Sequence, residues 1–153
     1  MSHLTLAAIQ LTSTEDVGKN LQTSARLVKQ AAASGAQLIG LPENFAYLGS
    51  DRDHRASLAE PIAAGAPGPV GPILEAMRRL AQETSAWLLL GGFPERAAGA
   101  APDGGRDAAP RIRNTSILLA PNGEIAAVYR KIHLFDVDVP GGLRFRESES
   151  VTR

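Results

Sequence analysis

The stretch "AQLIGLPEN", residues 36–44, decides the fold class because it reads as a short buried strand that stops at a proline. Proline biases the residue before it to an extended backbone and ends regular structure. Upstream, apolar residues recur in steps of three and four from Val17 to Ala32, and Gly35 follows them. This spacing predicts an amphipathic helix with a left-handed cap. A helix that leads directly into a buried strand is typical of an α/β fold.

The same alternation continues in both directions along the chain. Residues 4–11 predict a strand, residues 73–86 a second helix, and "WLLLGGF", residues 87–93, a third strand. Residues 114–120 and 125–135 predict two strands around an Asn-Gly turn, and the Ala-, Gly- and Pro-rich residues 96–111 predict a surface loop. The order is strand, helix, strand, helix, strand, strand, strand. It predicts an α/β layered fold with a mainly buried sheet.

Composition excludes several classes of partner. A chain of 153 residues with 16 basic and 16 acidic side chains is long enough for one domain and has no field that attracts nucleic acid or an anionic membrane. No apolar run approaches the roughly 20 residues that span a bilayer, and the N-terminus lacks a signal-peptide pattern, so we expect a cytoplasmic protein. The absence of cysteine excludes disulfides, thiolate metal sites and thiol catalysis within these residues.

The sequence also lacks the common cofactor motifs. There is no G-x-G-x-x-G, no G-x-x-x-x-G-K-[ST] and no G-x-S-x-G, so neither a phosphate cradle nor a serine nucleophile elbow is indicated. The histidines, His3, His54 and His133, are far apart and have no ligand spacing. We therefore expect no metal and no cofactor.

Two positions have a local signal for chemistry. Glu43 follows a strand that ends at Pro42, and α/β sheets bind ligands at the carboxyl ends of their strands, although a solvated loop glutamate fits the same pattern. Strand alternation places Tyr129, Lys131 and His133 on one face, where Lys131 could line a pocket or could instead discourage pairing at a sheet edge. Glu147 has no local signal.

Several motifs together resemble the nitrilase superfamily of carbon-nitrogen hydrolases. "AAIQL", "GAQLIGLPENF", the "GG" after the third strand, "RNTSILLAPNGEI" and "YRKIHLFDVDVPG" followed by F-x-E-S stand in the family's order over nearly the whole chain. The last run is most similar to the branch of omega-amidase and deaminated-glutathione amidase. The resemblance implies an α/β four-layer α-β-β-α sandwich, a small-molecule amide substrate, no cofactor and a homo-oligomer in the full-length form.

The resemblance also implies roles for particular residues. Glu43 matches the general base, Lys131 the cation that stabilises the oxyanion, and Glu147 a second glutamate that positions them. Tyr47, close after Glu43, would help to bind substrate, although an aromatic residue beside a strand end is more often packing.

One departure from the family concerns its cysteine nucleophile, which belongs beyond Glu147, whereas this chain ends at Arg153 without a cysteine. We expect residues 4–153 to be a carbon-nitrogen hydrolase domain truncated before the nucleophile. Such a chain would be the N-terminal half of the sandwich, with exposed apolar sheet surface and no amidase activity of its own. The alternative is a non-catalytic half-domain that acts as an oligomerisation or partner-binding module.

Overall fold

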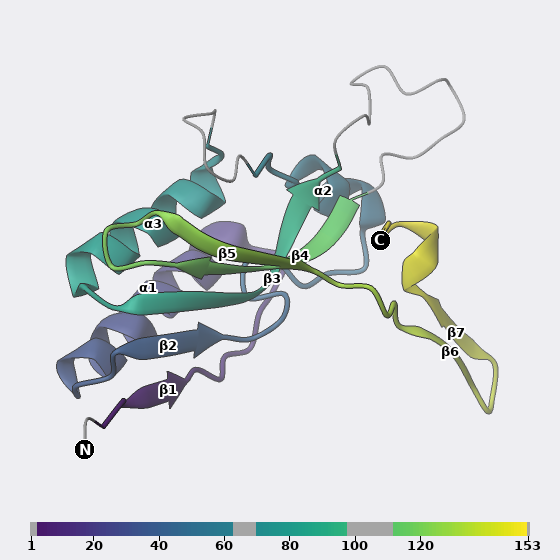
Figure 1. Ribbon diagram of the computed structural model, residues 1–153. Coiled ribbons are helices and arrows are strands. Elements are labelled where there is room, and N and C mark those ends of the chain that lie inside the picture. The colour runs from purple at the N-terminus through teal and green to yellow at the C-terminus, as the bar shows by residue number, and fades with distance from the viewer. Residues whose placement is uncertain (1–2, 63–69, 98–111, 153) are drawn as a thin grey trace.

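The computed structural model describes residues 3–62, 70–97 and 112–152, and it centres on a five-stranded sheet (Figure 1). The elements in chain order are β1 (Leu6–Ala8), α1 (Val17–Ala33), β2 (Leu38–Leu41), α2 (Arg52–Ser57), α3 (Pro72–Thr84), β3 (Trp87–Arg96), β4 (Ile112–Leu119), β5 (Ile125–Arg130), β6 (Asp136–Val139), β7 (Leu143–Arg146) and the 3₁₀ helix η1 (Glu147–Glu149). The strand order in the sheet is β1-β2-β3-β4-β5, and β6 and β7 form a separate hairpin.

The sheet is parallel on one side and antiparallel on the other. β1, β2 and β3 run parallel because helices connect them, and β4 and β5 are added antiparallel. The predicted Asn-Gly turn joins β4 to β5, and Gly123 adopts a φ of 80° there, a conformation that glycine tolerates best. The predicted α/β fold is therefore confirmed.

Helices α1 and α3 cover one face of the sheet, as Figure 1 shows. The apolar stripe predicted for the second helix is the buried face of α3, made by Ile73, Leu74, Met77, Leu80 and Ala81. It packs on alternate strand residues, which include Ile39, Leu41, Leu88, Leu90, Ile117 and Leu119. Full burial of each large aliphatic side chain contributes about 1.5–3 kcal/mol, so this layer is the main source of stability.

The opposite side of the sheet is not covered by these helices, and we call it the open face. Strand alternation turns Leu6, Trp87, Leu89 and Tyr129 toward it, and their exposed fractions are 63%, 38%, 39% and 58%. This is the apolar sheet surface expected from the sequence. Two layers, helices on one sheet, correspond to half of a four-layer sandwich.

The last predicted strand is shorter than expected. It was predicted over residues 125–135, but β5 ends at Arg130 and Lys131 makes the final backbone hydrogen bond, from its N–H to the carbonyl of Asn114 at 2.9 Å. Beyond that point Val151 takes the place beside β4, because it bridges to Ile112. The edge of β4 is therefore already occupied, and the chain departs as the β6–β7 hairpin, which projects from the sheet in Figure 1.

Other differences are local. Helix α2 was not predicted, although Asp51 caps it by accepting a hydrogen bond from the N–H of His54 at 2.9 Å. The third strand extends beyond its predicted end to Arg96, which the sequence had assigned to the loop over residues 96–111. Residues 98–111 of that loop lie outside the described residues.

Candidate active site

Glu43 stands two residues after the end of β2, in a turn at the carboxyl end of this strand. A pair of glycines on β3 makes room for it. A Cβ atom on Gly91 would lie 2.4 Å from the carbonyl oxygen of Leu41, and one on Gly92 would lie 2.8 Å from Cγ of Glu43. The "GG" that follows the apolar part of β3 therefore lets the end of β2 and the Glu43 side chain lie against the neighbouring strand.

Lys131 comes to the same place from the end of β5. Alternation turns it to the open face with Tyr129, as predicted, even though β5 itself stops one residue earlier. Its Nζ atom lies 3.1 Å from Oε1 of Glu43, a residue 88 positions away in the chain. The two residues that the sequence singled out on local grounds are thus in direct contact.

Glu147 completes the cluster from the first residue of η1. Its Oε2 atom lies 2.9 Å from Nζ of Lys131 and accepts a hydrogen bond of 2.7 Å from the backbone N–H of Phe135. One ammonium group therefore bridges two carboxylates. The structure brings Glu43, Lys131 and Glu147 together, although Glu147 has no signal of its own in the sequence.

The electrostatics fix the charge on this cluster. Partial burial lowers the pKa of Lys131, but hydrogen bonds and charge attraction from Glu147 and Glu43 outweigh it, so the pKa lies above the ordinary value. Burial raises the pKa of Glu147, but the donors Phe135, Lys131 and Asn114 outweigh it, so this pKa lies below the ordinary value. At neutral pH Lys131 is therefore a cation and Glu147 an anion.

Asn114 on β4 is a part of the site to which the sequence assigned no role. It is 5% exposed, and its Nδ2 atom donates to Oε1 of Glu43 at 2.5 Å and to Oε1 of Glu147 at 3.3 Å. The sequence did contain one signal for Asn114, which lies in the run "RNTSILL". A hairpin that turns at Asn122-Gly123 places Asn114 opposite Lys131.

Tyr47 is placed apart from this cluster by its contacts. It is 4% exposed, its hydroxyl donates to the carbonyl of Asp51 at 3.4 Å, and its ring meets His54 edge-on at 5.1 Å between centroids. Among the described residues, no hydrogen bond or aromatic contact joins Tyr47 to the three charged residues. These contacts match the packing interpretation, and substrate binding by Tyr47 stays a prediction.

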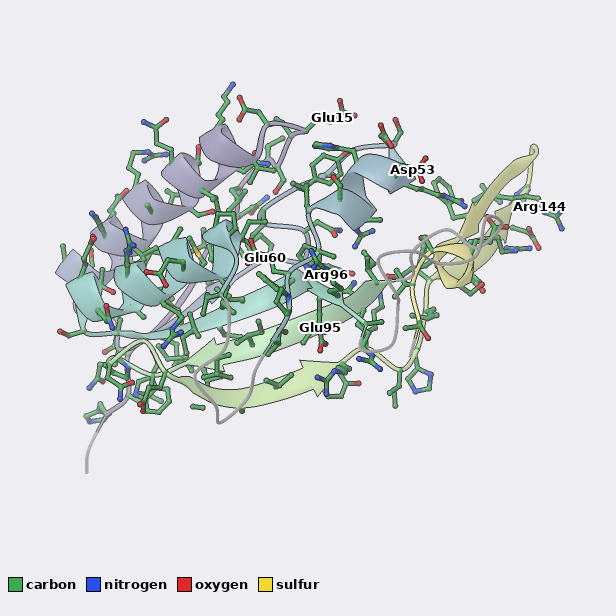
Figure 2. All side chains as sticks on the ribbon, turned by 90° about the horizontal axis from the view of Figure 1, so that it is seen from above. Glu15, Asp53, Glu60, Glu95, Arg96 and Arg144 are labelled. Atoms are coloured by element: carbon green, nitrogen blue, oxygen red, sulfur yellow. The ribbon has the colours of Figure 1, made fainter. Side chains whose placement is uncertain are left out.

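Strand alternation turns the side chain of Arg130, the neighbour of Lys131, to the opposite face of the sheet. It donates two hydrogen bonds of 2.7 Å to Glu95, which is 3% exposed and also accepts one from Thr115 at 2.7 Å. Figure 2 shows Glu95 on the sheet, with Glu60 and Arg96 close by. Neither cation of the "YRK" run therefore stands unpaired at an edge.

Residues 3–62, 70–97 and 112–152 contain no group of three or more histidine, cysteine, aspartate or glutamate residues that could hold a metal ion. None of their helices has the length and apolar character required to cross a bilayer.

The chain belongs to the carbon-nitrogen hydrolase family, whose model matches residues 5–153. It is 39% identical over 145 residues to the deaminated glutathione amidase of Synechocystis sp. PCC 6803, with 95% of this chain and 47% of the relative covered. It is 40% identical over 147 residues to the human deaminated glutathione amidase, with 95% and 40% covered. To the omega-amidase of Xenopus tropicalis it is 32% identical over 152 residues, with 99% and 48% covered.

Solved structures give the same result. The C. elegans NitFhit protein aligns with a TM-score of 0.76 and 29% identity, over 98% of this chain and 34% of that chain. Nit3 of Saccharomyces cerevisiae, a member of branch 10 of the nitrilase superfamily, aligns with a TM-score of 0.73 and 26% identity, over 97% and 48%. The resemblance drawn from the motifs is confirmed. The chain spans about half the length, or less, of the curated relatives it matches.

Proposed function

We propose that the full-length form of this chain is an amidase that hydrolyses a small ω-amide to a carboxylic acid and ammonia. The observation that carries the proposal is the contact of one ammonium group, Lys131, with the carboxylates of Glu43 and Glu147. The amidase names of the relatives support it and favour it over a non-catalytic half-domain.

In this proposal Glu43 is the general base. Lys131 and Asn114 both donate to its Oε1 atom, whereas Oε2 has no hydrogen-bond partner among the described residues. Oε2 is therefore the atom that would take the proton of the nucleophile and later hand a proton to the departing ammonia. General acid-base catalysis of this kind contributes about 10²- to 10⁴-fold.

Lys131 is the electrostatic partner in the same proposal. Its raised pKa keeps it protonated at neutral pH, so it acts as a cation and not as a base. Its ammonium group would stabilise the oxyanion of the tetrahedral intermediate, and loss of such a donor costs about 3–4 kcal/mol in other enzymes. Glu147, with its lowered pKa, would hold the ammonium group in place.

The nucleophile is the remaining part. None of the 153 residues is a cysteine, so we propose that residues 4–153 supply the acid-base and cationic groups and that a cysteine encoded after Arg153 supplies the attacking thiolate. The 153-residue chain alone is then expected to be inactive.

The test begins with the DNA that follows the codon of Arg153. We expect a cysteine codon there, and ammonia release from a small ω-amide by the longer product. Glu43→Gln keeps the shape of the side chain and removes the base, so it is expected to abolish that release. A stop codon with no cysteine downstream, or full activity of Glu43→Gln, would contradict the proposal. Ammonia release by the 153-residue chain would contradict its predicted inactivity.

Two further statements belong to the same proposal. We expect the full-length form to be a homo-oligomer, which light scattering tests as a discrete mass above that of one chain. A cytoplasmic location stays a prediction from the sequence, and fractionation of cells that express the full-length protein tests it.

A further inference from the structure

We propose that Asn114 is a positioning residue for the site, and this inference rests on the proposed amidase function. One buried residue forms hydrogen bonds with all three residues of the cluster, with two of them through their carboxylates and with Lys131 through its backbone. The side-chain amide donates to Glu43 and Glu147, and the backbone carbonyl accepts the hydrogen bond from the N–H of Lys131.

The chemistry of the amide group suits this position. A carboxamide has two N–H donors in one plane, so its nitrogen can serve two acceptors, whereas an ionised carboxylate only accepts. The Oδ1 atom lies on the side of Gly92, 3.0 Å from the place where a Cβ atom would stand. The opposite orientation would set the amide oxygen against two carboxylates, so the hydrogen-bond network requires Nδ2 to face Glu43 and Glu147.

The location of Asn114 makes it a rigid support. It lies within β4, which pairs with β3 on one side and meets the last residues of β5 on the other. Glu43, by contrast, stands in a turn, and Glu147 stands in a single turn of 3₁₀ helix. The residues on irregular backbone are therefore bound to a residue in the sheet, which fixes their separation.

The consequence for the reaction concerns a single oxygen. Asn114 and Lys131 together hold Oε1 of Glu43 and leave Oε2 for proton transfer. Without the amide, Glu43 would keep only the contact with Lys131, and its carboxylate would be able to rotate. Misplacement of a catalytic group by about 1 Å can cost about 10²-fold in rate.

The test compares Asn114→Leu, which keeps the size of the side chain and removes both donors, with Ser116→Ala. Ser116 lies on the same strand and the same open face, but it donates to the carbonyl of Gly91 at 2.9 Å and does not contact the site. The readout is the pKa of the Glu147 carboxyl, from an NMR titration of the 153-residue chain. Asn114→Leu is expected to raise this pKa because it removes a donor to the ionised form, and Ser116→Ala to leave it unchanged.

An unchanged pKa of Glu147 in a folded Asn114→Leu variant would overturn the inference. If the leucine variant does not fold, Asn114→Ala is read in the same way, because it also removes both donors and does not overfill the site. In the full-length protein Asn114→Leu is expected to lower kcat by about a hundredfold with little change in KM. If the wild-type full-length protein releases no ammonia, the proposed function fails, and the titration still decides the role of Asn114.

Discussion

Replacement of Arg130 by methionine is expected to destabilise the fold, whereas replacement of Lys131 is expected to alter the site and leave the fold nearly intact. The Glu95 side chain is 4% exposed and would lose its bidentate partner in Arg130→Met. Removal of one partner from a buried ion pair costs about 3–5 kcal/mol. Arg130 itself is 44% exposed, and Thr115 continues to donate to Glu95, so we expect a cost at or below the lower bound of this range, about 2–3 kcal/mol.

The matched change Lys131→Met affects a more exposed cluster. The side chains of Lys131 and Glu43 are 28% and 49% exposed, so solvent screens much of their attraction. We expect a cost of about 1 kcal/mol or less, as for surface ion pairs. The change should instead appear in the pKa of Glu147, which rises because the carboxylate loses the hydrogen bond and the positive charge of Lys131.

Urea denaturation of the 153-residue chain measures both free energies of unfolding. At a slope of about 2 kcal/mol/M, the midpoint of Arg130→Met falls by about 1–1.5 M and that of Lys131→Met by about 0.5 M or less. Arg79→Met is the control, since Arg79 pairs with Glu75 on an exposed helix surface, where such pairs contribute about 0.2–0.5 kcal/mol. A midpoint for Arg130→Met equal to that of the control would refute the reasoning.

The pH dependence gives a second check on the Arg130 prediction. Burial raises the pKa of Glu95, but hydrogen bonds from Arg130 and Thr115 outweigh it, so the folded pKa lies below the ordinary value of 4.5. The stability that Glu95 contributes is therefore present above pH 4.5 and is lost as the pH falls through the lower folded pKa. The difference in free energy of unfolding between the wild type and Arg130→Met should therefore have its full value at neutral pH and should decrease in acid.

Three other changes test neighbouring features. Gly91→Ala places a methyl group against the backbone at the end of β2 and should cost about 1–3 kcal/mol in urea denaturation. Gly92→Ala instead pushes the Glu43 side chain away from Lys131, so the pKa of Lys131 should fall toward its ordinary value of 10.5 in an NMR titration. Glu60→Ala removes the acceptor of two N–H groups at the start of α3 and should lower stability by about 1–2 kcal/mol. Because burial raises the pKa of Glu60 above 4.5, its contribution declines as the pH rises through the folded value, and the cost should be larger below pH 4.5 than at neutral pH.

The body of the fold could be predicted from the sequence because its signals are periodic. The apolar stripe of α3 and the short apolar strands each depend on one local pattern, and the structure has them at these patterns, although β1 covers only Leu6–Ala8 of the predicted residues 4–11. The length of the last strand could not be predicted in this way. Alternation continues to residue 135, but pairing stops where Val151 takes the edge of β4 beside Ile112, and that competition depends on a contact between distant segments.

The site shows the same division. Glu43 and Lys131 were identified on local grounds, as a residue after a strand end and a cation on one strand face. Glu147 depends on contacts across the fold, which local patterns do not encode, and Asn114 depends on the register of the β4–β5 hairpin. The resemblance to a family supplied Glu147, while Asn114 appeared only when the hairpin register placed it opposite Lys131.

The position of the site on the open face has an electrostatic consequence. Two unit charges about 4 Å apart interact by about 1 kcal/mol in water but by about 4 kcal/mol at the effective dielectric constant near a protein surface. The described residues fix the positions of Lys131 and Glu43. Their side chains are 28% and 49% exposed, however, so solvent still weakens the electrostatic interactions of both charges. A layer that covered Tyr129, Leu89 and the rest of the apolar open face would also remove water from beside Lys131, which follows Tyr129 on the same side of the strand. If the proposed role of Lys131 holds, the step that buries the sheet would be the same step that gives the ammonium group its full effect on the oxyanion of the proposed reaction.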